Sequence, residues 1–399
     1  MARRLRLMVV ASTFPGHEDD GTPAFVRDLS SRLSEAFETT VLVPRVPGSQ
    51  RSEVIGNLRV ERFPYFPRRW EDLAHGAILE NLRERPLRWL QVPPFLLSEA
   101  LHLRRLLRRH RPDVLHVHWI VPQGLTALVV ARSVPWVVTT LGGDVYALND
   151  PISRRLKRAV LRRARAVTTM NVDMRERLIE AGSLPGSDPA TTYVQVLGAD
   201  METIRSAASA ETEVPGRLLF VGRLVEKKGV AVLLDALRML PTDLDWTLEI
   251  IGDGPLRSSL EAQAQGLPVT FSGAASREQL ARAYGRSTAV VVPSVPAASG
   301  DQDGLPTVVL EAMGAGRPIV ASALPGIDEA IEDGVTGLLA APNDPASLAR
   351  ALTQVLTDAE LRARLGQAAR LRSDDFTLEA CAKRFVDILS TAATAGPRR

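Results

Sequence analysis

Short hydrophobic runs alternate with longer amphipathic segments along nearly the whole chain. In the first half the pattern predicts strands at 5–10, 39–43, 114–117, 137–140 and 166–170, and helices at 25–37, 94–109, 125–131 and 152–164. In the second half it predicts strands at 217–221, 247–251, 269–271, 289–292, 318–321 and 337–339, and helices at 230–239, 255–265, 277–284, 307–314, 327–331 and 345–356. Because the strands are almost continuously apolar, we expect parallel sheets covered by helices on both faces.

The alternation stops at the polar stretch 207–215 and then starts again. This stretch is the predicted linker between two similar, doubly wound α/β domains, and a length of 399 residues suits two domains. Ligands of such sheets bind beyond the carboxyl ends of the strands, so we expect a cleft between the domains.

The segment 51–94 is rich in proline and aromatic residues and fits neither pattern. Its run from Phe63 to Pro67, together with Trp70, is either a packing insertion or a surface that faces an acceptor. Packing is the favoured interpretation.

Composition excludes several classes of protein. The hydrophobic fraction of 45% and the charged fraction of 24% are typical of soluble globular proteins. Cys381 is the only cysteine, which rules out an intrachain disulfide and a four-cysteine zinc site. The basic N-terminus precedes only about five apolar residues, fewer than a secretory signal needs. No apolar run approaches the length of a membrane span, and we expect a cytoplasmic protein.

Positive charge is concentrated in the first half, where residues 1–200 carry a net charge of +8 and the remainder carries −5. Much of the excess lies in two arginine-rich runs, 104–111 and 154–165. Such runs are either solvated helix faces or a surface for an anionic membrane, to which the protein would bind peripherally. Nucleic acid is not an expected partner, because no helix-turn-helix or aromatic–basic pattern is present.

The first candidate site follows the strand at 217–221. The run from Gly222 to Gly229 reads Gly-Arg-Leu-Val-Glu-Lys-Lys-Gly and leads through a turn into a helix. Gly222 permits a tight turn, and Arg223 and Lys228 are predicted to project from the loop. Two cations suit a diphosphate, because Arg can grip two oxygens while Lys is a compact charge. The alternative is that both are ordinary surface charges.

The second candidate site lies at the start of the helix predicted at 307–314. Pro306 suits the first turn of a helix, where the free N–H groups would bind an anion. Glu311 can accept hydrogen bonds from a vicinal diol such as a ribose, and Asp303 can bind sugar hydroxyls. Alternatively, Asp303 serves the helix N-terminus and Glu311 is an exposed helical residue. The donor-binding residues predicted here are Gly304, Leu305, Pro306, Thr307, Val308 and Glu311.

Together the two runs resemble the retaining glycosyltransferase family four, whose members have the two-domain GT-B fold. The family's Gly-Arg-Leu-x-x-x-Lys-Gly motif, which supplies a phosphate-binding Arg and Lys, is similar to the run from Gly222 to Gly229 without a gap. The family's Glu-x7-Glu element resembles the segment from Asp303 to Glu311, with Asp in place of the first Glu. The resemblance implies that Asp303 contacts the transferred sugar and Glu311 the ribose.

The resemblance covers most of the chain and adds further donor-side positions. The family's Gly-Asp-Gly turn is similar to Gly252-Asp253-Gly254, near the expected nucleoside. Ser272 would lie in a turn that passes the base, and Ser294 would open the loop that leads to Asp303. The segment 376–385 resembles the family's crossing helix. The implied division is an acceptor-side domain at 1–206, a nucleotide-sugar domain at 207–375 and a returning helix with a tail at 376–399.

Acceptor-side candidates lie in the first half. Gly21 and Thr22 resemble the family's glycine-bearing loop that approaches the donor phosphate or the acceptor, although a plain turn with a helix cap explains them equally. Alternation places His116 and His118 on the same face of a strand, and His118 is the candidate cleft residue, with a structural histidine as the alternative.

The run from Leu141 to Asp144 departs from the family pattern. Many relatives have His-Gly-x-Asp here, and their histidine meets the donor sugar; this chain has Leu141, while Gly142 and Asp144 remain. Asp144 is therefore a candidate for contact with a sugar or an acceptor, and no catalytic histidine is assigned.

The resemblance implies that the protein transfers a sugar from a nucleoside diphosphate sugar to a hydroxyl with retention of configuration. The basic first half suggests an acceptor at a membrane surface, in polysaccharide or glycolipid assembly. The nucleotide sugar would be a co-substrate and the acceptor a lipid-linked or other glycan. Neither a cofactor nor a metal site is predicted, because Arg223 and Lys228 would neutralise the diphosphate. The alternatives are a non-catalytic nucleotide-sugar binding subunit and a sugar-nucleotide 2-epimerase. A dehydrogenase is disfavoured, since no Gly-x-Gly-x-x-Gly follows the first strand.

Overall fold

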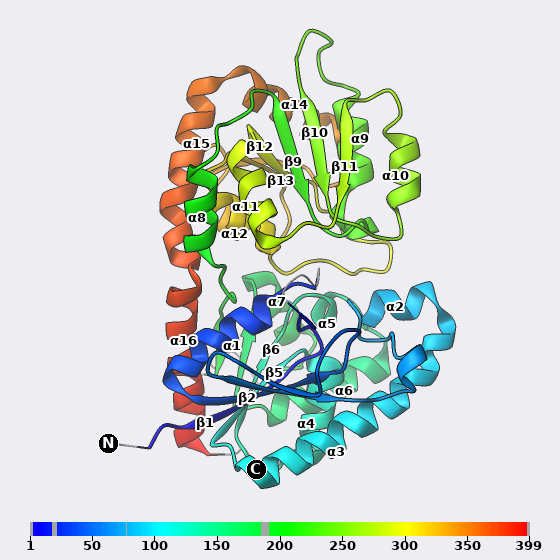
Figure 1. Ribbon diagram of the computed structural model, residues 1–399, viewed down its shortest axis with the longest axis vertical. Helices are drawn as coiled ribbons and strands as arrows, with labels where there is room; N and C mark the ends of the chain where they lie inside the picture. Colours follow the sequence, from blue (N-terminus) through cyan, green and yellow to red (C-terminus); the bar gives the residue numbers. More distant parts are fainter. Residues whose placement is uncertain (1–2, 18–21, 77, 185–190, 397–399) are drawn as a thin grey trace. The chain divides into compact units, whose positions relative to one another are not determined.

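The computed structural model describes residues 3–17, 22–76, 78–184 and 191–396. The chain divides into two compact units (Figure 1). Unit 1 comprises Met1–Leu197 and Cys381–Arg399, and unit 2 comprises Gly198–Ala380. The predicted α/β fold with two doubly wound domains is confirmed, since each unit contains one largely parallel sheet flanked by helices.

Unit 1 is built on an eight-stranded sheet in the order β3-β4-β2-β1-β5-β6-β7-β8. The strands are β1 (Arg6–Val10), β2 (Glu38–Pro44), β3 (Ser52–Ile55), β4 (Leu58–Phe63), β5 (Val114–His118), β6 (Trp136–Thr139), β7 (Ala166–Thr169) and β8 (Thr192–Val194). All neighbouring strands are parallel except β3 and β4, which form an antiparallel hairpin. The all-parallel prediction was therefore wrong at this edge, because a short connection at Gly56 joins the two strands.

The helices of unit 1 differ in length and cover both faces of this sheet. They are α1 (Phe25–Ala36), α2 (Ile78–Glu84), α3 (Val92–His110), α4 (Leu125–Val130), α5 (Gly143–Tyr146), α6 (Pro151–Arg163) and α7 (Val172–Glu180). Short helical turns are η1 (Arg68–Trp70), η2 (Pro86–Gln91) and the wider η3 (Ile120–Gly124). Helix α4 packs against both α3 and α6, so these three helices lie side by side.

The aromatic segment that the pattern could not place divides between packing and surface. Phe63 and Tyr65 are buried, and both rings lie against Phe95 of α3, with ring centroids 5.2 and 5.1 Å away. Packing therefore explains these two residues. Trp70, in contrast, is 54% exposed.

Unit 2 is built on a six-stranded, entirely parallel sheet in the order β11-β10-β9-β12-β13-β14. The strands are β9 (Arg217–Val221), β10 (Thr247–Ile251), β11 (Val269–Gly273), β12 (Ala289–Val292), β13 (Ile319–Ser322) and β14 (Leu338–Ala340). The helices are α8 (Met201–Ser209), α9 (Val230–Leu237), α10 (Arg257–Gln263), α11 (Arg277–Arg286), α12 (Thr307–Gly314), α13 (Ile327–Ala330), α14 (Pro345–Thr357) and α15 (Ala359–Arg372), with the turns η4 (Glu226–Lys228) and η5 (Ser373–Phe376).

Successive side chains along the unit 2 strands point to opposite faces of the sheet and pack into two apolar clusters, one on each face. In β9, Leu218 and Phe220 pack into the cluster under α9 and α14, whereas Leu219 packs into the cluster with α11 and α12. Both faces are therefore buried, as the apolar runs indicated.

The boundary between the units lies after Leu197, not after residue 206. Helix α8 belongs to unit 2 because its buried residues Met201, Ile204 and Ala208 face α11 and α12. The last helix, α16 (Leu378–Ala395), begins in unit 2, and its residues from Cys381 onward belong to unit 1, where Phe385 is buried. No helix among the described residues is both long and apolar enough to cross a membrane.

Candidate functional site

The turn after β9 is held by very close backbone contacts. At Gly229 the backbone has φ +67°, and an added Cβ would lie 1.7 Å from the carbonyl oxygen of Pro293. At Gly252, after β10, a Cβ would lie 2.0 Å from the carbonyl oxygen of Gly222. Only glycine permits these approaches. The loops after β9, β10 and β12 therefore gather at the carboxyl edge of the unit 2 sheet, where Gly254 also abuts the backbone of Leu224.

The two candidate runs meet through their charged side chains. Lys228 Nζ donates to Asp303 Oδ2 at 2.5 Å, and Lys227 Nζ lies 3.3 Å from Asp303 Oδ1. Lys227 also pairs with Asp301 at 3.2 Å. Burial would raise the pKa of Asp303, but the charges of Lys228 and Lys227 outweigh it and hold the pKa well below its ordinary value. Asp303 is therefore an anion beside two cations, and its carboxylate forms ion pairs with both lysines.

Helix α12 begins next to this cluster. It starts at Thr307, as predicted, but Pro306 precedes the first turn as the N-cap residue, with an extended ψ of 131°. No side chain of the N-cap residue accepts a hydrogen bond from the first turn. Leu305 and Thr307 are partly exposed, while Gly304 and Val308 are buried. The partial positive charge of the helix N-terminus is thus added to that of the two lysines.

Glu311 is fixed by a tyrosine. Tyr284 of α11 donates its hydroxyl to Glu311 Oε2 at 2.7 Å. Burial, together with the negative charge of Glu311, raises the pKa of Tyr284 well above its ordinary value. The hydroxyl therefore stays protonated and orients the carboxylate.

Three further donor-side candidates lie at the same strand ends. Arg223 follows Gly222 and is partly buried. Ser272 donates to Glu249 Oε1 at 2.9 Å. Ser294 is buried after β12, and within the described part of the chain its hydroxyl has no hydrogen-bond partner. Of the two serines, only Ser294 has an uncommitted hydroxyl.

Asp144 is buried in unit 1 and committed to the backbone. Its Oδ2 accepts from the N–H of Ile120 at 2.9 Å, and its Oδ1 accepts from the N–H groups of Leu141 and Gly142 at 3.0 and 3.2 Å. Burial raises its pKa, against the opposing effect of these hydrogen bonds. In this structure Asp144 ties together the loops after β5 and β6, and its contact with an acceptor stays a prediction.

His118 is completely buried, which departs from its expected place on a ligand-facing surface. Its ring centroid lies 4.2 Å from that of His116, and the His116 ring lies 5.3 Å from Phe385 of α16. Burial holds the pKa of His118 well below its ordinary value, so the ring is neutral. Among the described residues neither of its ring nitrogens has a hydrogen-bond partner. Thr22 is partly buried before α1, and Gly21 lies outside the described residues.

Sequence reasoning missed three residues that take part in the contacts at this edge of the sheet: Lys227, Asp301 and Tyr284. Lys227 and Asp301 each lie close in sequence to a predicted residue, but nothing in the pattern indicated that they pair. Tyr284 carried no signal, because a tyrosine on the buried face of a helix is typical of a core residue.

Two family models together match most of the chain. The model described as "Glycosyl transferases group 1" matches residues 202–372, and the "Glycosyl transferase 4-like domain" model matches residues 20–191. A curated relative, glycogen synthase of Mycobacterium tuberculosis, is 30% identical over 396 residues, covering 93% of this chain and 91% of the relative. The chain belongs to the group 1 glycosyltransferases. It is thus a transferase, as the resemblance implied.

Other comparisons agree with this membership. D-inositol 3-phosphate glycosyltransferase of Frankia alni is 32% identical, with 78% of this chain and 84% of the relative covered. Sucrose-phosphate synthase from Thermosynechococcus elongatus has a TM-score of 0.76 at 20% identity, over 98% of this chain and 100% of that one. Anabaena HepE in complex with UDP-glucose has a TM-score of 0.70 at 18% identity, over 97% of this chain and 100% of HepE. These likenesses support the GT-B fold.

Proposed function

We propose that this glycosyltransferase moves a sugar from a nucleoside diphosphate sugar to a hydroxyl group with retention of the anomeric configuration. The observation that carries the proposal is the ion pair between Lys228 and Asp303, at 2.5 Å beside the start of α12. It joins the phosphate-binding motif to the acid-x7-acid element, which lie 75 residues apart.

Each charged group has a place in donor binding. Arg223, Lys228 and the N–H groups at the start of α12 would bind the diphosphate, because each is positive. Glu311, oriented by Tyr284, would accept the ribose hydroxyls. Asp303 neutralises Lys228 in the ligand-free protein and would turn to the sugar hydroxyls once phosphate takes its place.

In the proposed reaction the bond between the anomeric carbon and the phosphate oxygen breaks, and the acceptor oxygen bonds to that carbon on the same face. The acceptor proton passes to the departing diphosphate. Negative charge grows on the diphosphate as the bond breaks, so the same cations that bind it stabilise the transition state.

The relatives support a nucleoside diphosphate sugar as the donor, but their names describe several different acceptors. HepE was solved with UDP and UDP-glucose. The names of the curated relatives describe glycogen synthesis and transfer to an inositol phosphate or to malate. We infer a hydroxyl acceptor, with polysaccharide or glycolipid assembly as the process.

The test begins with a thermal-shift panel of nucleoside diphosphates, followed by the matching sugar donors. With the active donor, Arg223→Ala and Lys228→Ala should each lower turnover by about 10²-fold, because a cation that stabilises the leaving group is lost. Arg364→Ala, an exposed arginine on α15, is the matched control. Near-wild-type turnover in both site variants would refute the assignment. NMR of the product reads the anomeric configuration, and an inverted product would refute retention.

A further inference from the structure

Large hydrophobic side chains are exposed on one part of unit 1. Nine of them come from η1, η2, α3, α4 and α6: Trp70, Leu87, Trp89, Leu90, Leu97, Leu101, Val129, Ile152 and Leu156. Leu87, Trp89 and Leu90 of η2 are 81%, 58% and 69% exposed. The described part of unit 2 exposes five such residues, each on a different element or loop. A concentration of this kind marks an interaction surface.

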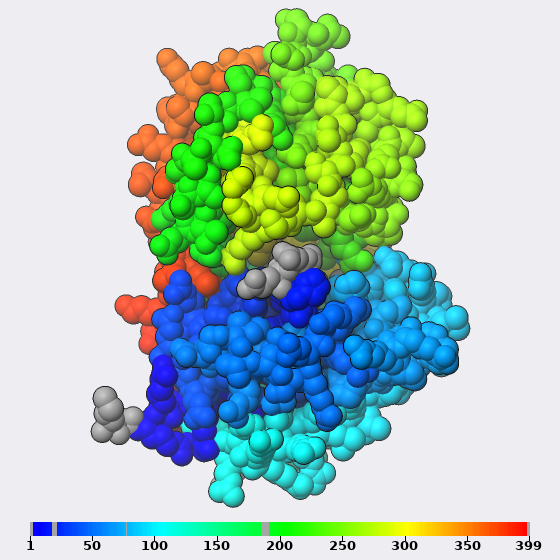
Figure 2. Space-filling view, in the orientation of Figure 1, coloured from blue at the N-terminus to red at the C-terminus, as the bar shows by residue number. Residues whose placement is uncertain are grey.

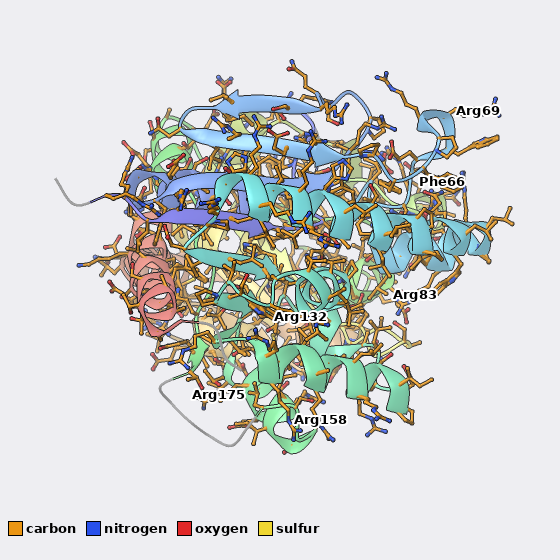
Figure 3. The ribbon with its side chains drawn as sticks, turned by 90° about the horizontal axis from the view of Figure 1, so that it is seen from below. Phe66, Arg69, Arg83, Arg132, Arg158 and Arg175 are labelled. Carbon is orange, nitrogen blue, oxygen red and sulfur yellow. The ribbon has the colours of Figure 1, made fainter. Side chains whose placement is uncertain are left out.

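These elements are neighbours in the fold. The helical turn η2 runs directly into α3, and α4 lies between α3 and α6. Asp72, just after η1, pairs with Arg88 of η2 at 2.9 Å, which links the first two turns. The segment that contains η1, α2, η2 and α3 forms one continuous light-blue to cyan surface in the space-filling view (Figure 2). Figure 3 looks onto α3 and α6, with Arg83, Arg132 and Arg158 labelled around them.

Arginines surround the exposed apolar residues. The outward stripe of α3 begins with Pro93, Leu97 and Leu101 and continues with Arg104, Arg105 and Arg108. On α6, exposed Ile152 and Leu156 are interleaved with exposed arginines. The basic apolar face is defined by Leu87, Trp89, Leu90, Leu97, Leu101, Ile152 and Leu156 with Arg104, Arg105, Arg108, Arg154, Arg155 and Arg162.

The helices of this face carry little compensating negative charge, although Asp72 and Glu84 pair with Arg88 of η2 and Asp150 caps the start of α6. Within α3, α4 and α6 the only acidic residue is Glu99. It is fully buried, and burial raises its pKa to about 8, so it is largely neutral at pH 7. Like charges would repel a second copy of this face. The arginines follow the apolar stripe on α3 and lie between the apolar residues on α6, so a matching partner has to offer anionic groups beside an apolar layer.

We propose that the basic apolar face docks on an anionic lipid bilayer. Tryptophan and leucine would enter the interfacial region, and the arginines would reach the phosphate groups of the lipids. The proposal does not depend on the transfer reaction. It would place unit 1 against a membrane whether the acceptor is lipid-linked or not.

The test is sedimentation of the full chain with phosphatidylcholine vesicles that contain or lack phosphatidylglycerol. Binding should require the anionic lipid and weaken with salt, since exposed charges are screened. Arg105→Ala with Arg108→Ala should lower partitioning about 25-fold, since each arginine near the surface contributes about fivefold. Arg350→Ala with Arg364→Ala, both exposed in mid-helix on unit 2, is the matched control and should bind as wild type.

Tryptophan fluorescence provides a second readout. Tryptophan emission should shift to shorter wavelength on binding and be quenched by brominated lipid, and Trp89→Phe should reduce that quenching. Absence of binding at low salt, or equal binding by both arginine pairs, would overturn the proposal. Self-association abolished by Leu90→Ser but not by the control Leu371→Ser on α15 would instead assign the face to a second copy. Nucleoside diphosphate binding should be unchanged in every variant, which verifies folding.

Discussion

Replacement of Gly229 by alanine tests whether close backbone contact shapes the turn that we propose binds phosphate. The new Cβ would lie 1.7 Å from Pro293 O, whereas real Cβ atoms essentially never come within 3.0 Å of another heavy atom. The loop after β12 and the turn that ends in Lys228 would have to separate by more than 1 Å. Overpacking of this kind costs about 1–3 kcal/mol, and the backbone at φ +67° adds about 1–2 kcal/mol for any residue with a Cβ.

The matched control is Gly266→Ala. Gly266 also has positive φ, +79°, but nothing lies within 4 Å of its added Cβ. The control therefore loses only the free energy of placing a Cβ at positive φ. The difference in unfolding free energy between the two variants then gives the cost of the contact between the new Cβ and Pro293. We expect Gly229→Ala to be less stable than the control by about 2 kcal/mol, which lowers the unfolding midpoint by about 4–8 °C more for a domain of this size.

Differential scanning calorimetry with and without nucleoside diphosphate measures both consequences. Nucleoside diphosphate should raise the unfolding midpoint of wild type and of the Gly266 variant by similar amounts, because their affinities for it are the same. The Gly229 variant should lose most of that ligand-dependent shift, because the displaced turn carries Lys228. Equal destabilisation of the two variants, or an unchanged ligand shift in the Gly229 variant, would show that the close contact with Pro293 does not shape the site.

Three further predictions concern charged groups and their partners. Asp303→Asn should raise the affinity for nucleoside diphosphate about 10-fold, as measured by isothermal titration calorimetry. Phosphate then no longer competes with Asp303 for Lys228, and a charged hydrogen bond is worth about 1.5 kcal/mol. Weaker binding would contradict this. Tyr284→Phe should weaken nucleotide binding about fivefold by releasing the Glu311 carboxylate, at about 1 kcal/mol for one hydrogen bond; unchanged affinity would count against that role. The pKa of Glu99 in the folded protein, about 8, lies above its ordinary value of 4.5, so the folded state favours the neutral carboxyl. The free energy of unfolding of wild type should therefore fall as pH rises from about 5 to 8. Denaturant titrations should show no such fall for Glu99→Gln.

The strand and helix ends that carry the donor-side candidates were predictable because local sequence patterns determine them. Strands β9 and β12 are almost continuous apolar runs, and β10 is apolar except at Thr247 and Glu249, so their ends could be located to the residue. Helix α12 begins at Thr307, as predicted. Parallel strands place their carboxyl ends at one edge, which brings Lys228 and Asp303 together although they are distant in sequence. The pairing of Lys227 with Asp301 could not be predicted, since it depends on the conformation of the loop after β12.

The first half was harder to interpret because burial, not residue type, decides what its polar groups do. The hairpin of β3 and β4 was missed because β3 has only four residues, none of them buried, and because Arg59, Glu61 and Arg62 interrupt the apolar residues of β4. Pattern alone could not distinguish a buried histidine from a ligand-facing one, and His118 proved to be buried.

Asp144 shows why a shared motif does not transfer a role by itself. A carboxylate that accepts three backbone N–H bonds from two loops would leave all three donors unsatisfied if it turned to a substrate, at a cost of about 1–3 kcal/mol for each. An acceptor hydroxyl could offset only one of them. Any contact between Asp144 and a sugar therefore has to use a lone pair that the loops leave open, without breaking the bonds that shape them.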